Sequence, residues 1–352
     1  MKKFYILDST LRDGEQTAGV AFSRKQKIAI AKMLDQLGID IIEVGIPAMG
    51  KEEIATISEI IASKPKAEIM TWNRMVLADI DKSLKTGAKS VHISAPVSDI
   101  HIQHKLKKTR EWVLKNIEKV VSYAVNKNCI VSVGAEDASR ADQEFLLEFY
   151  KTALNAGAIR LRYADTVGLM EPLLVHQTIS VLKREIDAEI DYHGHNDFGM
   201  ATANALAAFK AGAKYISCTI NGLGERAGNT ALEEIVMALK YIEKSDSKIQ
   251  VEKLMHLSKA VESLSGRFLS DSKPIVGKKI FSHESGIHVD GLLKDSRTYE
   301  AFSPEDIGRK RDFVLGKFSG SSAVLHKYKE EGKEISREEA NLILAGLRKN
   351  YS

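Results

Sequence analysis

The sequence predicts a (β/α)8 TIM barrel, an α/β fold, followed by a mostly helical C-terminal extension. Eight short runs of strand-forming residues alternate with longer segments of helical periodicity. Such alternation indicates a parallel sheet, and eight is the number of strands that closes this barrel. Several helical segments end at a glycine, where left-handed C-caps are expected: Gly38, Gly87, Gly157 and Gly212. A doubly wound open sheet is the alternative, but no phosphate-binding glycine fingerprint follows the first strand.

The expected elements follow one another in a regular order along the chain. The predicted strands cover residues 4–7, 41–45, 68–72, 90–94, 130–133, 160–163, 189–192 and 215–219. The predicted helices between them include 25–37, 51–62, 109–126, 143–155, 172–183, 200–211 and 230–241. The alternation stops near Ser245, so we expect a catalytic barrel over 1–245 and a C-terminal subdomain over 246–352. In that subdomain we expect a helix at 251–264, an irregular glycine-rich region at 274–291 and a last helix at 337–349.

The composition is that of a soluble globular protein. The 352 residues carry 51 basic and 47 acidic side chains, a net charge of +4, which gives no case for nucleic acid but suits anionic substrates. The only cysteines, Cys129 and Cys218, lie in apolar stretches, so we expect buried thiols and a reducing, cytoplasmic location. The N-terminus meets a charge too early for a signal peptide, and no apolar run is long enough for a membrane helix.

The pair His193 and His195 predicts a metal site. Residues two apart on a strand point to the same side, so both imidazoles can bind one ion. Asp13 follows the first strand and is the expected third ligand, with the Asn229 amide as a further candidate. Such a mixed nitrogen and oxygen set suits Mg²⁺, Mn²⁺, Fe²⁺ or Zn²⁺. Packing is the competing interpretation for a histidine pair alone.

The ends of the other predicted strands also carry polar residues, which is where TIM barrels place their active sites. The first strand leads to Arg12 and Gln16, the fifth to Glu136 and the sixth to Thr166. Arg12 alone would be read as a surface charge, and Glu136 as a cap of the following helix.

Three long motifs resemble the DRE-TIM metallolyases, and within them the acetyl-CoA-dependent 2-isopropylmalate, citramalate and homocitrate synthases. The motifs are residues 11–16, 193–197 and 221–229. The tail segments 285–291 and 298–300 resemble the synthases' C-terminal subdomain, which the simple lyases lack. Segments 44–50, 92–99 and 134–140 are most similar to the homocitrate synthase of nitrogen-fixing bacteria.

The resemblance implies an acyltransferase that condenses acetyl-CoA with a 2-oxo acid and then hydrolyses the thioester. It implies a divalent metal, Mg²⁺ or Mn²⁺ first and Zn²⁺, Fe²⁺ or Co²⁺ as alternatives, held by Asp13, His193, His195 and Asn229. Arg12 would stabilise the developing alkoxide. His288, assisted by Tyr299 and by Glu136, would remove a methyl proton from acetyl-CoA. The family's dimers imply that His288 and Tyr299 act on the partner's barrel.

Homocitrate requires 2-oxoglutarate, whose distal carboxylate needs a cation in the barrel. Arg162 shares the strand parity of Thr166 and is the candidate, whereas a structural pairing with Glu43 is the competing interpretation. In the lysine-pathway enzymes an arginine stands where this chain has Ser132. The alternatives are therefore a 2-isopropylmalate or citramalate synthase, a lyase or aldolase of the same superfamily, and a non-enzymatic binding barrel.

Overall fold

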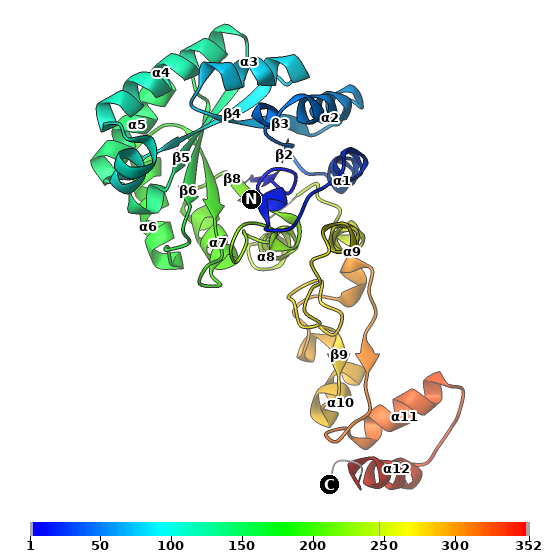
Figure 1. Ribbon diagram of the computed structural model, residues 1–352. Coiled ribbons are helices and arrows are strands. Elements are labelled where there is room, and N and C mark those ends of the chain that lie inside the picture. Colours follow the sequence, from blue (N-terminus) through cyan, green and yellow to red (C-terminus); the bar gives the residue numbers. More distant parts are fainter. Residues whose placement is uncertain (1–2, 246, 350–352) are drawn as a thin grey trace. The chain divides into compact units, whose positions relative to one another are not determined.

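Eight parallel strands form a closed barrel in the computed structural model, which describes residues 3–245 and 247–349 (Figure 1). Each strand pairs with its neighbours in sequence, and β1 pairs with β8 to close the ring. The strands are β1 (Tyr5–Asp8), β2 (Ile41–Glu43), β3 (Glu68–Arg74), β4 (Ser90–Pro96), β5 (Ile130–Glu136), β6 (Arg160–Asp165), β7 (Glu189–Gly194) and β8 (Tyr215–Cys218). The predicted TIM barrel is confirmed.

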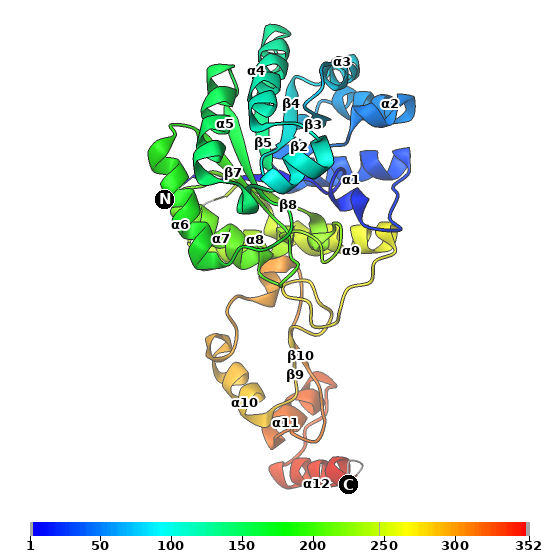
Figure 2. The same ribbon diagram turned by 60° about the vertical axis from the view of Figure 1, so that its left-hand side comes forward.

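Eight helices follow the strands and lie around the outside of the barrel (Figures 1 and 2). They are α1 (Arg24–Leu37), α2 (Lys51–Ala62), α3 (Leu77–Thr86), α4 (Arg110–Asn126), α5 (Gln143–Asn155), α6 (Pro172–Glu185), α7 (Ala201–Ala211) and α8 (Leu232–Tyr241). Helix α1 begins with a capping box at Ser23, and Gly38 ends it with a φ of 95°. Between β4 and α4 lies a π-helical turn, η3 (His101–Leu106), that the sequence did not predict.

The described chain divides into two compact units. Among the described residues, the barrel unit comprises 3–245, 247–250 and 256–268, and the C-terminal unit comprises 251–255 and 269–349. Helix α9 (Leu254–Ser265) adds to the barrel unit through Ser258, whose hydroxyl donates a hydrogen bond to the Asn221 side chain. The predicted second domain begins at residue 246, which lies outside the described residues.

The C-terminal unit is mostly helical, as expected. It contains α10 (Gly286–Lys294), α11 (Ser321–Glu330) and α12 (Arg337–Lys349), with a short parallel pair of β9 (Ser282–His283) and β10 (Asp312–Phe313). The irregular region predicted over 274–291 was wrong in its last part, because α10 begins at Gly286. Val289 and Leu292, three residues apart, anchor this helix in an apolar cluster with Phe313 and Ala323.

Among the described residues, no helix is both long enough and apolar enough to cross a bilayer.

Candidate active site

Three of the predicted metal ligands meet at the carboxyl ends of the strands. His193 Nε2 lies 3.0 Å from Asp13 Oδ2 and 3.2 Å from His195 Nε2. One ligand atom from each of the three lies within 4.8 Å of the others, and all three side chains are buried. Two buried imidazole nitrogens facing a carboxylate oxygen match the donor set of a divalent cation. These residues therefore fit the metal that the sequence implied.

Asn229 reaches the same place through a tightly folded glycine loop. Its backbone forms a bridge with His195, and its amide nitrogen donates to the carbonyl of Leu223. Its side-chain oxygen Oδ1 is buried without a hydrogen-bond donor. A Cβ at Gly228, where φ is 89°, would lie 2.0 Å from the Gly222 carbonyl oxygen, so the loop requires glycine there. The loop thus brings the Asn229 backbone alongside that of His195 and leaves the Asn229 amide oxygen buried and unpartnered.

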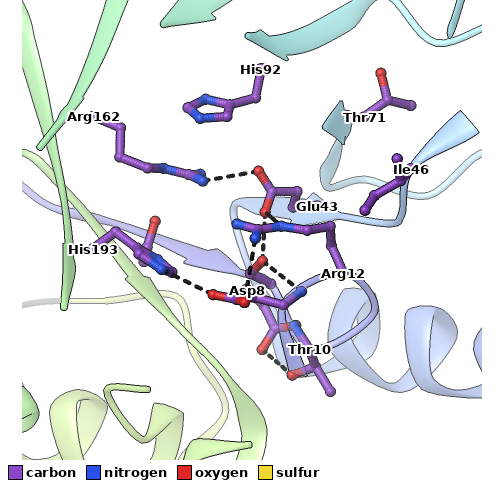
Figure 3. Close-up of polar contacts among 12 residues, drawn as sticks. Asp8, Thr10, Arg12, Glu43, Ile46, Thr71, His92, Arg162 and His193 are labelled. Atoms are coloured by element: carbon purple, nitrogen blue, oxygen red, sulfur yellow. Dashed lines mark hydrogen bonds and ion pairs between the residues drawn. The ribbon is translucent and has the colours of Figure 1, made fainter. Parts of the chain in front are cut away.

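Near the metal cluster, Glu43 at the end of β2 links two arginines (Figure 3). Arg12 Nε lies 2.6 Å from Glu43 Oε2, and Arg162 Nη1 lies 3.1 Å from Oε1. Arg162 Nε also contacts Asp191 Oδ2 at 2.6 Å. The structural pairing of Arg162 with Glu43 is therefore present, but Arg162 Nη2 is buried with no hydrogen-bond partner.

The electrostatics of the site follow from this arrangement. Burial raises the pKa of Glu43, but Arg12 and Arg162 outweigh it and hold that pKa well below its usual range. The pKa of Asp13 is likewise lowered, because Arg12 and His193 outweigh the effect of burial. Burial, reinforced by the neighbouring His193, lowers the pKa of His195 to about 4. Asp13 is thus ionised and His195 neutral near pH 7, the states in which both can bind a cation.

The end of β5 turns sharply to present Glu136. The next residue, Asp137, has a left-handed backbone with a φ of 63°, and its N–H donates to Thr166 Oγ1 at 2.8 Å. Glu136 does not cap α5, because that helix begins at Gln143 with Asp142 as its N-cap. A strained backbone beside a cleft is a frequent feature of functional sites.

Many of these groups line one cavity of about 260 Å³, whose lining does not include Glu43, Asp137 or the predicted ligand Asn229. Most of the predicted barrel residues line it: Arg12, Asp13, Gln16, Glu136, Arg162, Thr166, His193 and His195. The lining also includes Trp72, His92, Ser94 and Lys105, to which the sequence assigned no role. His92 and Ser94 share a parity on β4 that could have revealed them. Lys105 lies on the unpredicted π-helical turn, so no strand-end argument reaches it.

Ser132 stands at the position where the resemblance places an arginine in the lysine-pathway enzymes. Its Oγ lies at hydrogen-bond distance, 3.0 Å, from His92 Nδ1. Burial, together with the nearby Arg162, lowers the pKa of His92 well below its usual value. His92 is therefore a neutral hydrogen-bonding group against the pocket.

His288 and Tyr299 come together within the C-terminal unit. Their ring centroids lie 4.2 Å apart, and Tyr299 is 43% exposed. A Cβ at Gly291 would lie 2.6 Å from the Tyr299 ring, so the glycine permits this packing. The next residue, Glu300, is held by two Arg311 nitrogens at 2.7 Å each. The motif thus forms a single cluster in which an imidazole and a phenol face solvent together.

Fold and site together define a TIM-barrel protein with a candidate divalent-metal centre. Comparison with family models gives a match of residues 3–261 to the HMGL-like family and of residues 275–351 to the "homocitrate synthase post-HMGL domain-like" family. The chain belongs to the HMGL-like family. The resemblance to the DRE-TIM metallolyases and to their acetyl-CoA-dependent synthases is thereby confirmed.

Two relatives cover almost the whole chain. The chain is 54% identical over 348 residues to 2-isopropylmalate synthase 2 of Caldanaerobacter subterraneus subsp. tengcongensis, covering 99% of this chain and 91% of the relative. It is 45% identical over 348 residues to homocitrate synthase 1 of Nostoc sp., covering 99% and 92%. An HMG-CoA lyase from Bacillus subtilis has the same fold, with a TM-score of 0.70, 22% identity and coverage of 76% of this chain and 96% of the lyase.

Proposed function

We propose that this protein is a metal-dependent acyltransferase that condenses acetyl-CoA with 2-oxoglutarate and hydrolyses the thioester, giving (R)-homocitrate and CoA. The observation that carries the choice of a dicarboxylic oxo acid is the orphan Nη2 of Arg162. A buried guanidinium nitrogen that lines the pocket without a partner suits a carboxylate of the substrate. The relative from Nostoc, named a homocitrate synthase, supports the same choice.

The barrel residues have separate roles in the proposed reaction. A divalent ion held by Asp13, His193 and His195, with Asn229 as a further ligand, would supply Lewis-acid polarisation of the oxo acid's carbonyl group. Arg12 is fixed by Glu43 and directed at the same region, where it stabilises the negative charge that develops on the carbonyl oxygen. Gln16 and Thr166, both on the cavity wall, orient the oxo acid.

Proton removal from the methyl group of acetyl-CoA requires a base. His288 takes this role in the proposal, with Tyr299 and Glu136 assisting. The proposal further includes a homodimer in which His288 and Tyr299 of one subunit serve the barrel of the other. Mixing the inactive variants His193→Ala and His288→Ala would then restore about a quarter of the parent activity, since mixed dimers keep one intact site. No recovery would contradict action between subunits.

A 2-isopropylmalate synthase is the second candidate, favoured by the 54% identical relative of that name. The chemistry would be the same, with 2-oxoisovalerate in place of 2-oxoglutarate. The citramalate synthase alternative uses pyruvate in the same way.

The test is release of the CoA thiol from acetyl-CoA with Mg²⁺ or Mn²⁺ and a panel of 2-oxo acids. We expect turnover with 2-oxoglutarate, and a loss in Arg162→Ala that is larger for this diacid than for 2-oxoisovalerate or pyruvate. Preference for 2-oxoisovalerate or pyruvate would overturn the choice of a dicarboxylic substrate and leave the proposed mechanism in place. Absence of thiol release with every acid would favour the lyase or the non-enzymatic barrel.

A further inference from the structure

The π-helical turn η3 brings a lysine into the active-site cavity. The turn follows β4 and ends at Lys107, whose backbone is left-handed with a φ of 54°. Lys105 and Glu136 both line the cavity, although they come from different β-α connections. Wide turns of this kind are uncommon and recur at functional sites. The position of Lys105 therefore calls for an explanation from the chemistry of the site.

Lys105 makes a close ion pair with Glu136. Its Nζ donates to Glu136 Oε1 at 2.5 Å. His101, four residues earlier on the same turn, places Nδ1 at 3.4 Å from that same oxygen and Nε2 at 3.7 Å from Asp137 Oδ2. Both contacts on Glu136 fall on Oε1, so Oε2 can take another partner. Lys105 on this turn thus holds one oxygen of the carboxylate, whereas His101 Nδ1 lies near that oxygen without a hydrogen-bond partner.

The other cations of the cavity are engaged elsewhere. Arg12 contacts Glu43, and Arg162 contacts Glu43 and Asp191. Arg226 pairs with Asp197 at 2.7 Å. Among these cations of the cavity wall, Lys105 is the one that pairs with Glu136.

Stability gives little reason for this pair. The Lys105 side chain is 53% exposed, and ion pairs at such exposure contribute about 0–1 kcal/mol. Glu136 is 21% exposed and faces the cavity. The contact therefore matters for the orientation of the Glu136 carboxylate rather than for stability.

We propose that Lys105 is a positioning residue for Glu136, placed by the π-helical turn. This inference rests on the proposed function, in which Glu136 assists proton removal. Lys105 holds Oε1 of the Glu136 carboxyl group and leaves Oε2 directed at the substrate.

The experiment measures kcat and KM for thiol release by Lys105→Met, Lys105→Arg and the control Lys107→Met, which makes the same charge change outside the cavity. We expect Lys105→Met to lower kcat about tenfold with little change in KM for the oxo acid. Lys105→Arg should recover most of the loss, and Lys107→Met should match the parent. A rise in KM with unchanged kcat would overturn the inference, because Lys105 would then bind substrate directly. So would a kcat for Lys105→Met equal to that of the parent.

A double variant decides whether Lys105 acts through Glu136. In a Glu136→Gln background, Lys105→Met should have almost no further effect on kcat. An equal loss in both backgrounds would overturn the inference while leaving the proposed function intact. A parent protein without thiol release would overturn the proposed function and this inference together, so the two failures are distinguishable.

Discussion

Arg162 Nη1 and Glu43 Oε1 lie 3.1 Å apart in the barrel interior, with side chains that are 2% and 0% exposed. Glu43 also receives Arg12, so one carboxylate orients both guanidinium groups of the site. Charges buried this deeply are tolerated only when they are paired and hydrogen-bonded. Glu43 therefore has a structural role: it holds both guanidinium groups in place in the site.

Glu43→Gln should be strongly destabilising. It leaves Arg12 and Arg162 without their shared anion, and breaking a buried pair on one side costs about 3–5 kcal/mol. Urea unfolding measures the loss. The control is Glu59→Gln, which breaks an exposed pair with Arg24 and should cost less than about 1 kcal/mol. Equal effects of the two variants would show that burial of Glu43 has no energetic consequence.

Much of the barrel could be predicted from sequence because its signals are local. Strand and helix patterns alternate, and Gly38 ends α1 with a left-handed residue, as its position indicated. The sequence could assign one metal site to Asp13, His193 and His195 because each follows or ends a parallel strand, and such strand ends meet at one edge of the barrel.

The remaining features depend on contacts between distant segments. The approach of Lys105 to Glu136 arises from a π-helical turn, for which the sequence carries no periodic signal. The two carboxylates that pair with Arg162, Glu43 and Asp191, come from β2 and β7. Strand parity shows only that the arginine faces inward. Helix α10 was missed because glycines at both ends of its motif conceal a short apolar face.

Removal of a metal ligand should strongly weaken cation binding without unfolding the barrel. His193→Ala and Asp13→Asn each delete one of three converging atoms, and we expect the affinity for Mn²⁺ to fall by at least about 100-fold. Calorimetric titration of dialysed protein measures it, with the exposed His176→Ala as control. Parent-like affinity in either variant would exclude this cluster as the metal centre.

Asp8 should make the protein less stable as pH rises. Burial, opposed by hydrogen bonds from Thr10, raises the pKa of Asp8 to about 7 in the folded state. A carboxyl whose folded pKa is raised favours folding at low pH, and that contribution is lost as pH rises from about 4 through 7. The loss is roughly 4 kcal/mol, and Asp8→Asn should remove it. Unfolding free energies of parent and variant from pH 5 to 8 should therefore converge or cross; parallel curves would contradict the raised pKa.

Gly291→Ala should impair catalysis while leaving the C-terminal unit folded. The added methyl group would lie 2.6 Å from the Tyr299 ring, which is partly exposed and can swing outward, away from its packing against His288. If His288 and Tyr299 act together, kcat for thiol release should fall about as far as in Tyr299→Phe, with little change in melting temperature. The matched control is Gly346→Ala, because Gly346 lies inside α12 with no atom within 4 Å of the new methyl group. That change should stabilise the helix by about 0.5–1 kcal/mol and leave kcat unaltered. Full activity in Gly291→Ala would show that the contact between the two rings is dispensable, whereas a large fall in melting temperature would assign the glycine to packing alone.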